Sequence, residues 1–354
     1  MATKFDAIMA RRGEIMLAAL GMDYSVFEQS PIAFDYEGMM SAHGYSLDDI
    51  VGIQTRAGVG HTPLLELKNL TDVVRSMSAP GKGARIFVKD EAANMAGAFK
   101  DRRASVSIHV AKEKGYEGVI AATSGNYGAA VSSQAARYGL KCIICQETFD
   151  SRHIGQPEIV EKSRICEAFG AEVLQLTVGP ELFFHMVELL DQTGYFAASL
   201  YSSFGVSGIE TLGLEIAEEM TALTGAPPTH CVITHAGGGN TTGTARGLKR
   251  AGATDTQIIS ASVDLSGLHM ASDDDFNRKS FTTGHTGFGV PFATWPDRAD
   301  VPRNAARSLR YIDRYLTVTQ GEVFYITEAM SKIEGLERGP ARWRTARRSR
   351  CGRW

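Results

Sequence analysis

Residues 118–146 read GVIAATSGNYGAAVSSQAARYGLKCIICQ. An apolar run at 118–122 is followed by a polar turn, a helical pattern over 127–138 and a second apolar run at 141–146. Strands that are apolar throughout are buried on both faces, which is typical of parallel sheets covered by helices. The stretch therefore predicts a strand–helix–strand unit whose two strands are parallel.

The same alternation of short apolar runs and helical patterns extends along the chain. It predicts further strands at 85–89, 172–176, 231–235, 257–263 and 315–319. It predicts further helices at 3–20, 101–114, 158–169, 208–223 and 242–250. The fold class is therefore α/β, with parallel sheets flanked by helices.

Composition limits the kind of protein. The chain has 354 residues, of which 44% are hydrophobic and 22% charged, as in soluble globular proteins. It has no apolar run near the roughly 20 residues that span a bilayer, and five cysteines in this length are not a disulfide framework. We expect a cytoplasmic protein. Cys142 and Cys145 are three residues apart in a predicted strand, which favours buried thiols over a redox or metal site, and no metal is predicted.

Charge is unevenly distributed. Residues 341–354 read ARWRTARRSRCGRW and contain six arginines, so the net charge of −3 leaves −9 on residues 1–340. The acidic body offers no general nucleic-acid surface. The basic tail is expected to be disordered, and its abrupt composition indicates a truncated or out-of-frame end; the alternative is a genuine short basic tail.

Lys100 is the first candidate for chemistry. It follows a turn of small residues and stands at the start of a predicted helix, whose positive end disfavours the ammonium form. This suits a lysine that attacks a carbonyl group to form an imine. The alternative is a helix-start lysine among surface charges.

Two polar turns follow predicted strands and precede predicted helices. The first turn consists of Thr123, Ser124, Gly125 and Asn126. Its hydroxyl, amide and backbone N–H groups could bind a carboxylate or a phosphate, although the same residue types are also ordinary helix caps.

The second turn consists of Gly237, Gly238, Gly239, Asn240 and Thr241. Consecutive glycines allow a ligand to approach the backbone, and the following helix favours an anion. Thr242 stands where a dinucleotide fingerprint has its third glycine, so a single phosphate is the better expectation. A plain flexible turn is the alternative. Together with an imine-forming lysine and a carboxylate-binding turn, this phosphate loop predicts pyridoxal 5'-phosphate acting on an amino acid.

At these residues the chain resembles the fold-type II pyridoxal-phosphate enzymes, which include threonine synthase and the tryptophan synthase beta chain. Residues 98–102, AFKDR, resemble the family's lysine motif Ser-Phe-Lys-Asp-Arg, with Ala98 in place of the serine. The resemblance implies that Lys100 holds the cofactor and that residues 237–241 bind its phosphate. It also implies that residues 123–126 bind the substrate carboxylate and that Asn126 faces the cofactor ring.

A closer resemblance is to the beta subunits of 2-amino-4-oxopentanoate thiolase. It rests on IAFDYEGMM at 32–40, ARIFVKDEAAN at 84–94, HAGGGN at 235–240 and above all the irregular insert at 269–307. It implies cleavage of 2-amino-4-oxopentanoate by coenzyme A to alanine and acetyl-CoA, a step of ornithine degradation, with a small alpha subunit in an oligomer. A threonine-synthase-like or dehydratase-like lyase and an inactive binding subunit are the alternatives.

The resemblance also implies further roles and a domain plan. His285, Thr286 and Arg307 of the insert are candidates to stabilise the oxyanion formed when a thiolate attacks the substrate carbonyl, although His285 could be a loop histidine bonded to the backbone. We expect an N-terminal extension over 1–60, a large cofactor-binding domain from 61–100 and 205–340, and a small domain over 101–204. Family members continue beyond the point reached at residue 340, where this chain has the basic tail.

Overall fold

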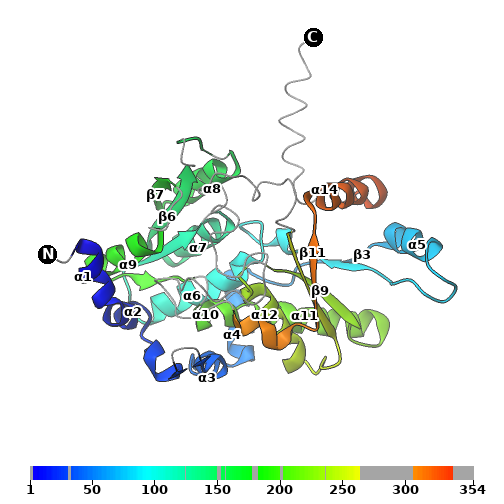
Figure 1. The fold of residues 1–354 in the computed structure, drawn as a ribbon, viewed down its shortest axis with the longest axis horizontal. Helices are drawn as coiled ribbons and strands as arrows, with labels where there is room; N and C mark the ends of the chain where they lie inside the picture. The colour runs from blue at the N-terminus through cyan, green and yellow to red at the C-terminus, as the bar shows by residue number, and fades with distance from the viewer. Residues whose placement is uncertain are drawn as a thin grey trace, which may run out of the picture.

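The computed structural model describes residues 3–30, 33–123, 125–149, 153–155, 157–177, 182–199, 202–235, 237–263 and 306–337. Two groups of strands lie side by side, with helices between and around them (Figure 1). The basic tail at 341–354, the residues up to 305 of the irregular insert, and Ser124 lie outside the described residues.

The first sheet has four parallel strands in the order β7-β6-β5-β8. They are β5 (Gly118–Thr123), β6 (Lys141–Phe149), β7 (Glu172–Thr177) and β8 (Phe196–Ala197). Every residue of β5 is buried, as an apolar central strand requires. The helices that follow or flank these strands are α6 (Lys100–Glu113), α7 (Asn126–Tyr138), α8 (Pro157–Ala168) and α9 (Leu182–Thr193).

The second sheet has three parallel strands in the order β11-β10-β9. They are β9 (His230–Thr234), β10 (Gln257–Val263) and β11 (Arg314–Val318). The accompanying helices are α10 (Ser203–Ser207), α11 (Glu210–Thr224), α12 (Gly239–Arg250), η4 (Ala306–Tyr311), α14 (Gln320–Ala329) and η5 (Met330–Glu334). In Figure 1 this sheet lies on the opposite side of α6 and α10 from the first sheet.

The N-terminal third supplies the remaining elements. They are α1 (Lys4–Ala10), α2 (Arg12–Leu20), η1 (Tyr24–Phe27), β1 (Glu28–Ser30), β2 (Ala33–Phe34), α3 (Tyr36–Ser41), α4 (Leu47–Ala57), β3 (Leu64–Glu66), α5 (Lys68–Ser76), β4 (Phe87–Lys89) and η2 (Glu91–Ala93). Strands β3 and β4 form a separate antiparallel pair.

All seven predicted strands are present, and the α/β class with parallel sheets is confirmed. Two expectations are wrong. The strand predicted at 85–89 was expected to belong to a parallel sheet. It instead pairs antiparallel with β3, a strand of three residues that is too short to be predicted from its sequence. The helix predicted at 3–20 is broken at Arg11, whose guanidinium bonds both to Glu14 and to Asp191 of α9.

Helices α11 and α12 cross in close contact because glycines face each other. A Cβ atom on Gly213 would lie 2.1 Å from the carbonyl oxygen of Thr244, and one on Gly247 would lie 1.9 Å from that of Glu210. These distances leave no room for any side chain. We call this contact the seam between α11 and α12. It fixes the position of α12 and so the position of the glycine turn at the start of α12.

Two further expectations concern burial and the membrane. Cys142 and Cys145 are buried on β6, and burial raises the pKa of each thiol to about 12, which fits the structural interpretation. Within the described part of the chain, none of the helices combines the length and the apolar character needed to cross a membrane.

Candidate functional site

Lys100 is the first residue of α6, as predicted. The turn before it contains Gly97, whose φ of 79° lies in the left-handed region that favours glycine. The buried carboxylate of Asp101 accepts a hydrogen bond of 2.9 Å from the backbone N–H of Ala96. The Lys100 amine lies 4.7 Å from the centre of the Phe99 ring. Asp101 therefore holds the turn that presents Lys100.

Burial makes the Asp101 carboxyl group easier to protonate. It raises the pKa of Asp101 to about 6, against the opposing effect of hydrogen bonds from the backbone of Ala96 and Ala98. The charge of nearby Glu91 raises the pKa further. The residue next to Lys100 in the sequence therefore titrates close to neutral pH.

Lys89 is the nearest alternative to Lys100 in the sequence, and its surroundings are different. Its amine makes ion pairs of 2.8 Å with Glu215 and 2.6 Å with Glu219, and it donates to the carbonyl oxygen of Thr62 at 2.6 Å. These two ion pairs and the hydrogen bond engage the amine with protein groups. This environment disfavours Lys89 as the residue that reacts with a carbonyl group.

The turn after β5 places Thr123 and Asn126 at the strand's carboxyl end. Thr123 is buried, and its hydroxyl accepts a hydrogen bond of 3.1 Å from the N–H of Gly125. Gly125 occupies the N-cap position of α7 and has no side chain to cap the helix, while Asn126 is exposed. These contacts stay within the turn, so its place beside Lys100 remains a prediction.

The glycine turn lies between β9 and α12. Gly238 has a φ of 80° and is the N-cap of α12, and Gly239 is the helix's first residue. Thr241 is buried, with its hydroxyl 3.1 Å from that of Ser260 and 3.5 Å from Nδ1 of His235. The amide nitrogen of Asn240 donates to the Thr234 hydroxyl at 3.3 Å.

The surroundings of this turn fit a phosphate group. A Cβ atom on Gly238 would lie 2.7 Å from the hydroxyl of Ser308, and one on Gly239 would lie 1.9 Å from a guanidinium nitrogen of Arg103. Gly238 also has a positive φ, which favours glycine, whereas a side chain at Gly239 would have to displace the guanidinium of Arg103. The turn combines the N-terminus of a helix with hydroxyl groups and a cation, which is the donor set of an anion site.

Arg103 joins two of the predicted motifs in space. It lies on α6, three residues after Lys100, and its side chain reaches the first residue of α12. The structure thus brings the start of the Lys100 helix against the glycine turn. Arg103, Ser260 and Ser308 were not predicted as site residues. Only Arg103 had a possible signal, because it directly follows the AFKDR motif.

Some candidates remain outside this description. Ser124, His285 and Thr286 are not among the described residues. Arg307 lies within η4, where only its backbone is described. No group of three or more metal-binding side chains occurs among the residues that the structure covers.

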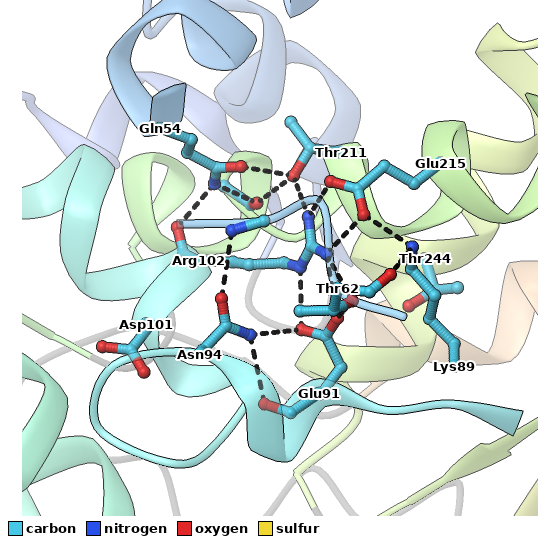
Figure 2. A network of polar contacts seen from close by, with 12 residues as sticks. Gln54, Thr62, Lys89, Glu91, Asn94, Asp101, Arg102, Thr211, Glu215 and Thr244 are labelled. Atoms are coloured by element: carbon cyan, nitrogen blue, oxygen red, sulfur yellow. Dashed lines mark hydrogen bonds and ion pairs between the residues drawn. The ribbon is translucent and has the colours of Figure 1, made fainter. Parts of the chain in front are cut away.

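A second polar cluster lies beside the site (Figure 2). The guanidinium of Arg102 is fully buried and bonds to Glu91 at 2.8 Å and to Glu215 at 2.7 and 2.8 Å. It also donates to the hydroxyl of Thr211 at 2.9 Å, and Thr211 in turn bonds to Gln54. We call these five residues the Arg102 network. The carboxylates of Glu91 and Glu215 neutralise the charge of Arg102, so the role of the Arg102 network is structural.

Comparison with known proteins defines the class of protein. The family model described as pyridoxal-phosphate dependent enzyme matches residues 55–341. The chain belongs to this family.

Two relatives narrow the comparison further. The chain is 69% identical over 339 residues to a 2-amino-4-ketopentanoate thiolase beta subunit from an unknown prokaryotic organism. It is 62% identical over 337 residues to the protein of the same name from Acetoanaerobium sticklandii. The matches cover 96% and 95% of this chain and 72% of each relative. The resemblance predicted from the sequence is confirmed at both levels.

Solved structures share the fold at low sequence identity. A threonine deaminase from T.th. has a TM-score of 0.61 and 23% identity, with 82% of this chain and 88% of that chain covered. A pyridoxal 5'-phosphate-dependent aspartate racemase has a TM-score of 0.63 and 17% identity, with 83% and 85% covered. These neighbours support the fold alone.

Proposed function

We propose that this chain is the catalytic beta subunit of a thiolase that cleaves 2-amino-4-oxopentanoate with coenzyme A to alanine and acetyl-CoA. The observation that carries the proposal is the identity of 69% and 62%, over nearly the whole chain, to two proteins named for this activity. Threonine synthases match only shorter stretches, for example 34% identity over 117 residues, which makes the lyase alternative weaker.

Three motifs hold the cofactor and the substrate in this function. The amine of Lys100 reacts with the cofactor's aldehyde carbon, residues 237–241 bind its phosphate, and Thr123, Gly125 and Asn126 bind the substrate carboxylate together with Ser124. When bound, pyridoxal phosphate supplies an electron sink for bonds next to the substrate amine. The anion-binding surroundings of the glycine turn and the ion pairs that hold Lys89 support this assignment.

Lys100 is also the candidate proton carrier. An amine that reacts with the cofactor lies beside the substrate's α-carbon, where it can remove a proton and return it. His285, Thr286 and Arg307 stay proposed as donors to the oxygen on C4 during thiolate attack.

The relatives' names imply the setting of the reaction. Because they are called beta subunits, we propose a small alpha subunit as partner in an oligomer, and coenzyme A as second substrate. We also propose a cytoplasmic location, because coenzyme A is available there. We also propose the division into an N-terminal extension, a large domain and a small domain at 101–204, which is supported by a four-stranded sheet built only from strands within that last range.

The test measures both product and cofactor attachment. The purified chain, mixed with its alpha subunit, 2-amino-4-oxopentanoate and coenzyme A, should release acetyl-CoA. Lys100→Ala should abolish turnover and the cofactor label fixed by borohydride, because the reacting amine is gone. Lys112→Ala, an exposed lysine on the same helix, is the matched control and should retain both.

Other outcomes would point elsewhere. Release of a 2-oxo acid without acetyl-CoA would favour the lyase alternative. Stable cofactor binding without any turnover in the complete mixture would favour the inactive binding subunit. A borohydride label on Lys89 would show that the assignment of Lys100 is wrong.

A further inference from the structure

Arg103 is a buried cation that the sequence motifs do not explain. Only 2% of its surface is exposed, although it carries a permanent charge. It lies three residues after Lys100 on α6, and residues three apart are neighbours on a helix surface. The guanidinium and the Lys100 amine therefore extend from neighbouring parts of the same helix.

The guanidinium is seated against the glycine turn. A Cβ atom on Gly239 would lie 1.9 Å from one of its terminal nitrogens and 3.0 Å from Cζ, so the group contacts the backbone of the first residue of α12. On its other side, Cζ lies 6.0 Å from the centre of the Phe99 ring, within range of a cation–π contact. Phe99 and Gly239 thus hold the guanidinium at the start of α12.

Its neighbour Arg102, the last residue of the AFKDR motif, faces different groups. Arg102 is bonded by Glu91 and Glu215 of the Arg102 network. Arg103 points instead toward the one helix start to which we assign a phosphate. A planar guanidinium matches a phosphate with two parallel hydrogen bonds, and such charge-assisted bonds are stronger than bonds from neutral donors.

We infer that Arg103 is a cofactor-binding residue, whose guanidinium pairs with the phosphate group bound at residues 237–241. The inference rests on the proposed phosphate loop and adds a cationic ligand to its neutral donors. Because Arg103 and Lys100 share α6, the same helix then holds the cofactor at its phosphate and at its aldehyde. Gly239 has a second role in this arrangement, since it leaves the space that the guanidinium fills.

The test compares two ligands that differ only in the phosphate. The apoprotein is titrated with pyridoxal 5'-phosphate and with pyridoxal, and binding is followed by visible absorbance. Arg103→Met should weaken binding of pyridoxal phosphate by about 10- to 100-fold and leave binding of pyridoxal within about twofold. Arg103→Lys, which keeps the charge without the planar fork, should show a smaller loss of the same selectivity.

Two controls separate charge from folding. Inorganic phosphate should raise the melting temperature of the wild-type apoprotein and have less effect on that of either Arg103 variant. Arg56→Met, which removes an exposed arginine of α4, should behave as wild type in both titrations. If Arg103→Met does not fold, Arg103→Lys decides the question by the same ratio of the two affinities.

The contrary results are distinct. Equal losses for pyridoxal phosphate and pyridoxal, or no loss for either, would show that Arg103 has only a structural role. A wild-type protein that binds the two ligands equally would overturn the assignment of the phosphate to residues 237–241. In that case the proposed phosphate loop fails before Arg103 is tested.

Discussion

At the scale of single residues, Asp101 shows how a buried carboxyl group holds the turn before a helix. Its carboxylate holds the backbone of Ala96, and so the turn that presents Lys100. The same burial raises the pKa of Asp101 to about 6, compared with an ordinary value of 3.8. The folded protein therefore binds a proton at Asp101 more readily than the unfolded chain does.

Asp101→Asn should change how stability depends on pH. A raised folded-state pKa means that the stabilising effect of protonation is full below pH 3.8 and is lost as the pH rises through 6. Asparagine stays neutral, so the variant does not lose this stabilisation. Its unfolding free energy minus that of the wild type should therefore increase by on the order of 2 kcal/mol between pH 4 and 7. Urea unfolding at several pH values measures this, and a difference that is constant with pH would contradict it.

At the scale of elements, the seam between α11 and α12 determines where the glycine turn lies. Gly213 and Gly247 let the two helices approach until their backbones touch. In an isolated helix these glycines would be unfavourable by about 1 kcal/mol relative to alanine. Their presence is explained by packing, because a side chain at either position would push α12 away from α11.

Gly247→Ala should therefore destabilise the protein, although alanine is the better helix former. The added methyl group would lie 1.9 Å from the carbonyl oxygen of Glu210, and relieving such overlap should cost about 1–3 kcal/mol of unfolding free energy. Gly13→Ala is the matched control, because Gly13 lies exposed in α2 with open space around it. The free energy of unfolding of Gly13→Ala should increase by about 0.5–1 kcal/mol. Thermal and urea unfolding measure both changes, and a stabilised Gly247→Ala variant would contradict the packing argument.

At the scale of the whole molecule, the Arg102 network connects distant parts of the chain. Its members come from α4, η2, α6 and α11, so they join the N-terminal third to the helices beside both sheets. Burial alone would raise the pKa of Glu215, but hydrogen bonds and ion pairs with Arg102 and Lys89 outweigh it and lower the pKa to about 2. Glu215 therefore stays charged well into the acid range.

Glu215→Gln should lower the free energy of unfolding by about 3 kcal/mol at pH 7, because the buried cations Arg102 and Lys89 each lose one of their two carboxylate partners. Because folding lowers the pKa of Glu215, the stabilisation from its charged form is complete above pH 4.5 and is lost as the pH falls through 2. The difference between wild type and variant should therefore shrink over that range. Glu218→Gln, an exposed change on the same helix, should stay within about 0.5 kcal/mol at every pH. An equal loss in both variants would contradict a special role for Glu215.

The sequence by itself determined the local features of this protein. A strand such as β5 was predictable because a short apolar run that is bounded by turn residues is typical of a strand buried on both faces. The position of Lys100 at a helix start and of the glycine turn between β9 and α12 followed from similarly local patterns. The family resemblance was equally accessible, since it rests on contiguous motifs.

Only the tertiary structure decided which distant residues meet. The antiparallel pairing of β3 with β4 and the contact of Arg103 with Gly239 each depend on a partner far away in the sequence. Periodicity reports which face of an element is apolar, but it carries no information about which element covers that face. Arg102 and Arg103 differ in role for this reason: they are adjacent in the sequence, yet their guanidinium groups face different neighbours.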